Sequence, residues 1–562
     1  MNPRLWYWVD RTRRSPPQRG MPDPRLLAQA YVDQGFMLTY VRWDVQTGWL
    51  AAPSHKELAG LPAAKRAPFD ASQRNVHGGW LLVPEALTYL GAPAAKSLIA
   101  SARGRGMRTA FLYADVLGEA AALPDQEEAN LRYAKALGEA DLVLCSDPAS
   151  ADKLLNFLWC NARRTASMDL RCRVVPFPAG DRSYATFCSD VSEHLVNKGG
   201  QRSLTTPANR RLPAPNTKAL PKPLLSLCIS TYNRADWLQH SLFAALQVTA
   251  PLADAVEVLD VDNASTDHTA EVVRAHSGAP HLRYTRNELN VGMLGNLKIT
   301  ANAARGAYVW IIGDDDIAIP GAVERILWGI TTLGDVPLIY LNYAYTQIDQ
   351  PDRLADLEPI FAKATPISHE FRDEYADEVR YIAAKTENCF TAIYCCVFRR
   401  DHAVRAYSID TSGEPFSTLN TCVPSAVHVL NELFHGPALW LGEPCVIVNM
   451  HVSWSQYAPQ FVLERLPEVY DLMEAKGTDR KQVDAIRQRS VPNIVSFMNH
   501  VLKGDADSGA RISLERLVRR YKHLGDFEAA LAHVFSGRGG AGRFAEPAQE
   551  VFKKYCVNAF KD

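Results

Sequence analysis

The segment LLSLCISTYNRADWLQHSLFAAL, which runs from Leu224 to Leu246, decides the architecture expected for the second half of the chain. Its first six residues form a mostly apolar run of strand length, and the polar residues STYN follow it. From Asp236 onward, Leu238, Leu242 and Leu246 recur with the spacing of one helix face. A buried strand, a polar turn and an amphipathic helix are the repeating unit of an open parallel sheet. We therefore predict an α/β domain that begins near Leu224.

The same alternation continues for about a hundred residues. Apolar runs predict further strands, and polar turns with capping residues predict the helices between them. The predicted strands are Val256–Val261, His281–Thr285 and Ala307–Ile312. One predicted helix has Thr266 or Asp267 as its N-cap, and another spans Gly295–Ala304 and ends at Gly306.

The first 197 residues show a similar alternation, which predicts a second, Rossmann-like parallel sheet. The expected strands are Trp80–Leu87, Thr109–Val116, Asp141–Asp147 and Arg173–Pro178, with helices such as Glu127–Ala140 between them. Residues 198–223 are rich in Pro, Gly, Ser, Thr and basic residues without periodicity, so they predict a linker. We expect domains at 1–197 and 224–460 and a helical region at 461–562.

Composition excludes several classes of protein. Apolar residues make up 47% of the chain and charged residues 22%, which is ordinary for a globular protein. The formal net charge is −1, so the chain lacks the basic excess of a nucleic-acid binder. The 11 cysteines contain no C-x-x-C pair, so we expect free thiols in a reducing cytosol. The first 14 residues are too polar for a signal peptide, and no run of about 18 apolar residues predicts a membrane span.

The segment RISLERLVRRYKHL, from Arg511 to Leu524, predicts a basic amphipathic helix. Such a helix either docks on anionic lipid, which would make the protein peripheral at the inner face of a plasma membrane, or packs on its own domain.

An acidic cluster follows the strand predicted at Ala307–Ile312. Asp314, Asp315 and Asp316 are consecutive, so their carboxylates repel one another and raise each other's pKa. A hard divalent cation such as Mn²⁺ or Mg²⁺ offsets that repulsion and bridges to phosphate oxygens. The alternative is a solvated acidic turn. The position after a buried strand favours a cation and a nucleotide diphosphate.

Three other polar segments follow in the same order along the chain. Because ligands bind at the carboxyl ends of parallel strands, we expect these segments to converge on the acidic cluster. Asp262 is expected to contact the ligand, whereas Asn263 is expected to serve a turn. The other candidate donor-binding residues are Ser230, Tyr232, Asn233, Arg234, Asn290 and Asn296.

The ordered series ISTYNR, VDNASTD, NVGMLGN and GDDD, between Ile229 and Asp316, resembles family 2 glycosyltransferases of the GT-A fold, most closely bacterial enzymes of surface-polysaccharide synthesis. The resemblance implies a nucleotide-diphosphate sugar donor, a divalent metal and inversion at the anomeric carbon. It also implies a glycan or lipid-linked acceptor. Ser230, Tyr232 and Asp262 match the family's nucleotide-binding positions, and the acidic cluster matches its D-x-D motif. The register is ambiguous, and Asp315 is the expected direct metal ligand, with Asp314 and Asp316 contributing.

Inverting transfer needs a base that takes the acceptor's proton. Many members of the resembled family supply it from a Glu-Asp pair, which this chain lacks in the corresponding region. His428 and Glu432 lie four residues apart in VPSAVHVLNELFH, so a helix would place them on one face as the catalytic pair. Trp454 is a candidate either for stacking on an acceptor sugar or for the core.

Segments Gly20–Asp44, Arg105–Val116 and Gly138–Leu158 resemble the N-terminal half of a family 4, GT-B glycosyltransferase. The nucleotide-binding half that normally follows is replaced by the linker and the GT-A series. The resemblance therefore implies a non-catalytic module that positions acceptor or partner. Two other functions remain open for the chain. One is a nucleotidyltransferase, and the other is a sugar-binding or assembly scaffold built from degenerate transferase folds.

Overall fold

The computed structural model describes residues 4–9, 21–62, 79–89, 92–117, 124–161, 172–178, 183–196, 222–333, 336–450, 454–502, 512–524 and 527. Except for Lys222 and Pro223, the predicted linker lies outside these residues. The chain divides into two compact units, Met1–Ser203 and Leu204–Asp562. The finer boundaries at 197, 223 and 460 stay predictions.

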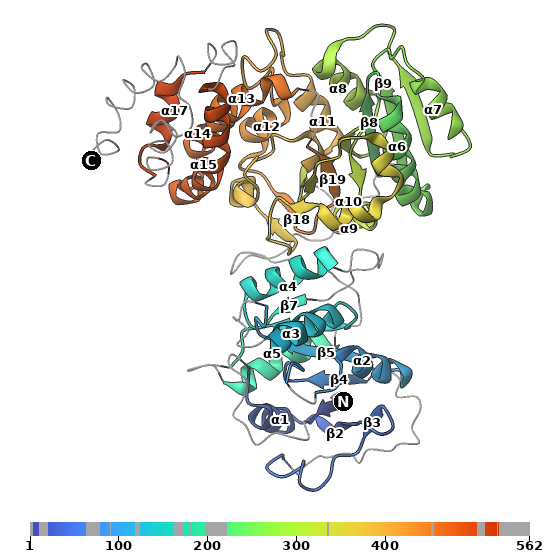
Figure 1. Ribbon diagram of the computed structural model, residues 1–562, viewed down its shortest axis with the longest axis vertical. Coiled ribbons are helices and arrows are strands. Elements are labelled where there is room, and N and C mark those ends of the chain that lie inside the picture. Colours follow the sequence, from blue (N-terminus) through green and yellow to red (C-terminus); the bar gives the residue numbers. More distant parts are fainter. Residues whose placement is uncertain are drawn as a thin grey trace. The chain divides into compact units, whose positions relative to one another are not determined.

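The first unit is built on a seven-stranded sheet with the strand order β3-β2-β1-β4-β5-β6-β7. All neighbouring strands are parallel except the β2/β3 pair. The order reverses between β1 and β4, as in a doubly wound fold. Its elements are β1 (Arg4–Trp8), α1 (Pro24–Asp33), β2 (Met37–Asp44), β3 (Trp49–Ala51), β4 (Trp80–Val83), α2 (Ala95–Gly104), β5 (Arg108–Tyr113), α3 (Pro124–Leu137), β6 (Leu142–Cys145), α4 (Pro148–Asn161), β7 (Cys172–Val174) and α5 (Tyr184–Val196) (Figure 1). The parallel α/β architecture predicted for this half is therefore present.

The second unit opens with four parallel strands that form one side of an eight-stranded sheet, β10-β9-β8-β11-β17-β13-β18-β16. The strands are β8 (Leu225–Thr231), β9 (Val256–Asp262), β10 (Leu282–Arg286), β11 (Tyr308–Gly313), β13 (Leu338–Leu341), β16 (Glu374–Ala376), β17 (Cys396–Arg399) and β18 (Ala438–Leu441). The chain first builds outward from β8 to β10 and then returns to place β11 on the other edge of β8. The strand order therefore reverses between β8 and β11.

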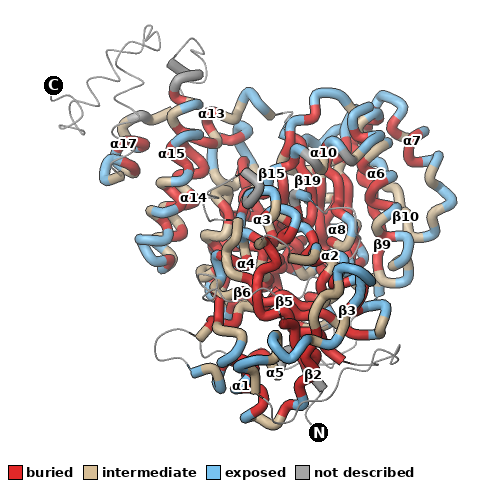
Figure 2. The backbone as a smooth tube through the Cα atoms, turned by 60° about the horizontal axis from the view of Figure 1, so that its bottom comes forward, coloured by how far each residue is buried: buried red, intermediate tan, exposed pale blue. Residues whose placement is uncertain are grey.

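The connecting helices pack in pairs against this sheet. α6 (Ala235–Thr249) and α7 (Thr269–Ala275) pack together, and α8 (Gly292–Ala303) packs beside α11 (Arg400–Tyr407) (Figure 1). The central strands are buried, and β9 is buried at all seven positions (Figure 2). A continuous core thus fixes the carboxyl ends of β8 and β11 relative to each other.

The remaining elements of the second unit complete the core. A four-stranded sheet, β12-β19-β14-β15, packs beside the large one. Its strands are β12 (Ile317–Ala318), β19 (Val446–Asn449), β14 (Ala344–Thr346) and β15 (Thr365–Pro366); the helices are α9 (Ala322–Leu333), α10 (Leu357–Lys363), α12 (Pro424–His428), α13 (Ala458–Gln460), α14 (Leu466–Ala475), α15 (Arg480–Leu502) and α17 (Leu514–Tyr521). Two short π-helical turns occupy Val429–Leu433 and Phe461–Arg465.

The basic amphipathic helix α17 packs on its own unit. Leu517, Val518 and Tyr521 are fully buried in a small core that includes residues of α15. Arg520 donates to Asp471 over 2.6 Å, so part of the basic face is paired within the protein. The apolar face is therefore not available to lipid in this conformation. Among the described residues, no helix is both long enough and apolar enough to cross a bilayer.

Candidate functional site

A cavity of about 500 Å³ opens where the strand order reverses, at the carboxyl ends of β8 and β11. This is the position where ligands enter open α/β sheets. The sequence candidates that line the cavity are Ser230, Tyr232, Arg234, Asn290, Asn296, Asp314, Asp315 and Asp316. Asn263 lines the cavity as well, so the structure brings together residues from all four polar segments.

The acidic cluster is buried and is paired with a single guanidinium. Arg234 Nη2 lies 2.8 Å from Asp315 Oδ2, and Arg234 Nη1 lies 3.4 Å from Asp314 Oδ1. The Thr231 hydroxyl donates to Asp314 Oδ2 over 2.8 Å, and the Gly313 amide donates to Asp316 Oδ2 over 2.7 Å. The arginine therefore supplies positive charge at the point where the sequence predicts a divalent cation.

The protonation of this cluster reflects its burial. The pKa of Asp314 is raised to about 7, and burial is the largest cause. The guanidinium of Arg234 opposes this rise, and the neighbouring carboxylate of Asp315 adds to it. Burial also raises the pKa of Asp316 well above its usual range, and Asp315 adds to the effect. The three crowded carboxylates form an oxygen donor set that fits a hard divalent cation.

A network of amide side chains shapes the opposite side of the cavity. Asn296 donates through Nδ2 to Ser230 Oγ and to the Val261 carbonyl, and Asn263 donates to Asn290 Oδ1 over 2.7 Å. Gly292, with a φ of 76°, follows Asn290 and donates its amide to that same oxygen. These bonds hold three loops in one arrangement around the cavity.

The roles of Asp262 and Asn263 are the reverse of those predicted. Asn263 lines the cavity, whereas Asp262 does not. The carboxylate of Asp262 accepts from the Tyr284 hydroxyl, from Arg286 Nε and from the Ser265 amide. Asn233 also lies outside the lining and joins its loop to the next one, because its Oδ1 accepts from the Thr266 amide over 2.7 Å. Both residues therefore support the loops instead of facing the cavity.

The far wall of the cavity comes from a region in which only Trp454 was a candidate from the sequence. Its residues include Asn388, Thr391, Tyr394, Phe416, Asn449 and Trp454. Cys389 and Phe390 are fully buried and both have a positive φ, of 40° and 64°. Such strained backbone in residues other than glycine has no sequence signature and often occurs at functional sites. Trp454 lines the cavity and also stacks on Phe416, with ring centroids 5.4 Å apart.

A model of the family Glycosyl transferase family 2 matches residues 226–406. These residues form a family 2 glycosyltransferase domain. The match includes all four polar segments and the strained loop, whereas Phe416, Asn449 and Trp454 of the cavity lining lie beyond it.

Curated relatives agree with this assignment over part of their length. Abequosyltransferase RfbV of Salmonella typhimurium is 38% identical over 96 residues, which are 16% of this chain and 28% of that protein. The uncharacterized glycosyltransferase MJ1057 of Methanocaldococcus jannaschii is 25% identical over 156 residues, 27% of this chain and 53% of that protein. The chain therefore spans between about a quarter and a half of these relatives.

Two solved structures are similar at low sequence identity. Residues 1–349 of S. aureus TarS, in complex with UDP-GlcNAc, give a TM-score of 0.36 at 18% identity and cover 59% of this chain and 91% of that chain. The mannosyltransferase PcManGT of Pyrobaculum calidifontis, in complex with GDP-Man and Mn²⁺, gives 0.32 at 14% identity, with 58% and 90% covered.

The structure does not bring His428 and Glu432 into the cavity of the glycosyltransferase domain. Neither residue lines it, and His428 is only 1% exposed, with its ring directed at His402. Burial lowers the pKa of His428 to about 4, with a further contribution from Arg405, so the ring is a weak base. Glu432 lies in a π-helical turn and pairs with Arg405 over 3.1 Å. Helical spacing alone predicted a shared face, but that face packs against α11.

Asp260 is a buried carboxyl whose oxygens have no hydrogen-bond partner. Burial raises its pKa well above the usual range, and Asp262 and Asp314 raise it further. A raised carboxyl pKa means that the folded state keeps a proton that the unfolded state has released, so its contribution to stability falls as pH rises above about 4.

We expect Asp260→Asn to be more stable than the natural protein at pH 8 by about 1–3 kcal/mol, because the amide cannot ionise. The difference should vanish toward pH 4. Melting temperature against pH measures this, with Asp254→Asn, at an exposed position, as the control. Parallel profiles for Asp260→Asn and the natural protein would contradict this account of Asp260.

Proposed function

We propose that the chain transfers a sugar from a nucleotide-diphosphate sugar to a hydroxyl of a glycan or lipid-linked acceptor, with Mn²⁺ or Mg²⁺ as cofactor. The observation that carries the proposal is the buried acidic cluster at the strand-order reversal of a family 2 glycosyltransferase domain. The family match supports the reaction class, and the similarity to an abequosyltransferase supports a sugar as the transferred group. We also propose that the transfer serves bacterial surface polysaccharide synthesis, as the resemblance in the sequence implies.

In this proposal Asp315 holds the cation, with Asp314 and Asp316 contributing. The cation neutralises the charge that develops on the departing nucleotide diphosphate. Arg234 would leave its carboxylate partners when the cation enters, and its guanidinium is then placed to bind a phosphate oxygen in a bidentate manner. The side chain is partly exposed, which allows this movement.

The other cavity residues would position the donor and the acceptor. Tyr232 is 42% exposed on the rim, so its ring can pack against a nucleobase. Ser230, Asn263, Asn290 and Asn296 present hydroxyl and amide groups suited to ribose and sugar hydroxyls. Trp454 gives the far wall an aromatic face for an acceptor sugar.

We infer that the first unit positions the acceptor or a partner without catalysing transfer itself. Its doubly wound sheet supports this proposal, because that architecture fits the resemblance to the N-terminal half of a GT-B enzyme. The expected cytoplasmic location is consistent with nine described cysteines that are buried and form no disulfide.

We expect UDP-, GDP- or dTDP-sugars to raise the melting temperature only when Mn²⁺ or Mg²⁺ is present, because a bound cation would offset the repulsion between the carboxylates and the pyrophosphate. At a hundredfold excess of donor over its Kd the stabilisation is about 2.7 kcal/mol. Thermal shift across the donor panel, with and without metal, measures it. A shift of equal size in EDTA would contradict the proposed cofactor role.

The reaction product separates the alternatives. A glycosyltransferase releases a nucleoside diphosphate, a nucleotidyltransferase handles pyrophosphate, and a scaffold releases neither. Chromatography of the nucleotides after incubation with donor and acceptor therefore decides among the three.

A further inference from the structure

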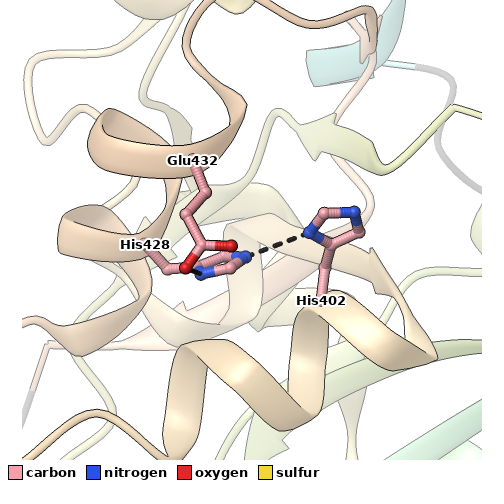
Figure 3. A group of neighbouring side chains, drawn as sticks. All are labelled: His402, His428 and Glu432. Atoms are coloured by element: carbon pink, nitrogen blue, oxygen red, sulfur yellow. Dashed lines mark hydrogen bonds and ion pairs between the residues drawn. The ribbon is translucent and has the colours of Figure 1, made fainter.

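Three side chains that the proposed transfer does not use lie close together where α11 packs against α12. His402 lies on α11, His428 ends α12, and Glu432 lies in the π-helical turn that follows. Figure 3 shows the two imidazoles facing each other, with the carboxylate of Glu432 beside the ring of His428. None of the three residues lines the donor cavity.

The spacing of these groups matches that of ligands around one ion. His402 Nδ1 lies 3.2 Å from His428 Nε2, and Glu432 Oε1 lies 3.6 Å from His428 Nδ1. One ligand atom from each residue falls within 4.8 Å of the other two. Two nitrogens bound about 2.0–2.1 Å from a tetrahedral zinc ion are roughly 3.3 Å apart. The imidazole nitrogens are thus already separated as two ligands of one ion would be.

The buried ring of His428 also has an incomplete set of partners. Its side chain is fully buried, and Nδ1 makes no hydrogen bond. Buried polar atoms are normally satisfied, and an ion held by Nε2 would leave Nδ1 as an N–H that faces the Glu432 carboxylate. Glu432 Oε1 lies 3.6 Å from Nδ1, a distance too long for a hydrogen bond.

A guanidinium at present supplies positive charge to this cluster. Arg405 Nη2 lies 2.8 Å from His402 Nδ1, and Arg405 Nε lies 3.1 Å from Glu432 Oε2. Arg399 and Asp401 also approach the ring of His402. The side chain of Arg405 is 47% exposed, so it can turn into solvent when a cation takes its place. Exposed ion pairs of this kind contribute little to stability, so the movement costs little.

We propose that His402, His428 and Glu432 bind a borderline divalent cation of the Zn²⁺, Co²⁺ or Ni²⁺ class, with solvent completing the coordination. Two imidazoles and one carboxylate are a ligand set that zinc takes, whereas the all-oxygen acidic cluster suits Mg²⁺ or Mn²⁺. The ion would join α11 to α12. Cys422 and Val423 line the donor cavity and directly precede α12. The ion would therefore also fix the part of the cavity lining that these two residues form.

The test uses the full chain carrying Asp315→Ala, which removes the other proposed metal site. Titration with Co²⁺ should give a visible ligand-field band that saturates at one equivalent, and Zn²⁺ should quench that band and raise the melting temperature by about 5 °C. Glu432→Gln and His402→Gln, each added to this background, should lose the band. His435→Gln is the matched control, because His435 is an exposed histidine that pairs with Glu378 outside the cluster.

A further variant keeps the test decisive if His402→Gln fails to fold. Arg405→Ala should bind Co²⁺ about tenfold more tightly, because it removes a positive charge next to the site. An unchanged Co²⁺ spectrum in Glu432→Gln, the absence of a band in the parent, or weaker binding in Arg405→Ala would overturn the proposal. The donor shift with Mn²⁺, measured in Glu432→Gln with Asp315 intact, reports separately on the proposed transferase.

Discussion

Replacing Asp315 with alanine is expected to lower the rate of sugar transfer by about a thousandfold or more. The carboxylate of Asp315 is the proposed direct ligand of the cation, and preorganised charge at a departing group contributes several kcal/mol to transition-state stabilisation. The melting temperature should change by less than about 2 °C. The variant removes one of three mutually repelling buried carboxylates, and Arg234 keeps a carboxylate partner in Asp314.

The matched control is Asp236→Ala, which removes a carboxylate from the neighbouring helix α6. Asp236 is 71% exposed and pairs with His268, so its loss should leave transfer unchanged. Initial rates with saturating donor and Mn²⁺ measure both variants. Full activity of Asp315→Ala would contradict the metal assignment, and equal loss in Asp236→Ala would show that the assay responds to general damage of the domain.

The second large effect is expected at Gly306, where alanine should destabilise the second unit by about 3 kcal/mol or more. A Cβ at this position would lie 2.4 Å from the backbone nitrogen of Ser226 and 2.7 Å from the carbonyl carbon of Leu225. Both atoms belong to or adjoin β8, the partner of β11, so relief of the clash must separate the two strands whose ends form the cavity. We expect loss of donor binding together with a fall of roughly 6–12 °C in melting temperature.

Gly278→Ala provides the control, because a Cβ at Gly278 would meet no atom within 4 Å. Its φ is also not in the left-handed range. Thermal denaturation of both variants, followed by circular dichroism, makes the comparison. A Gly306→Ala protein as stable as Gly278→Ala would show that β8 and β11 tolerate a wider separation than the structure indicates.

Gly306 also shows what local sequence rules miss. Its position after a helical segment predicted a residue that ends the helix. In the structure α8 ends at Ala303, and Gly306 is required because two backbones approach closely. The helix boundary was predictable from local spacing, but the clash depends on a strand 80 residues earlier in the sequence. Contacts of this kind become visible only once the sheet is assembled.

The first four strands and the loops after them were predictable, because apolar runs ending in polar residues mark the carboxyl ends of parallel strands. β8, β9, β10 and β11 are confirmed within one or two residues. The far wall could not be predicted, since it includes part of the 3₁₀ turn Ile393–Cys395 and Phe416, a residue other than glycine with a φ of 61°. The placement of His428 also failed, because sequence spacing does not show which helix packs over a given face.

The antiparallel strand β17 separates two groups of strands in the large sheet, and this order has a consequence for synthesis on the ribosome. The edge of β11 that does not face β8 pairs with β17, Cys396–Arg399. The four parallel strands therefore leave the exit tunnel about 85 residues before β17 is available to pair with that edge. An uncovered edge of this kind is a template for intermolecular pairing. Nascent chains arrested near residue 390 should therefore depend on chaperones to stay dispersed, whereas chains that extend past β18 should not.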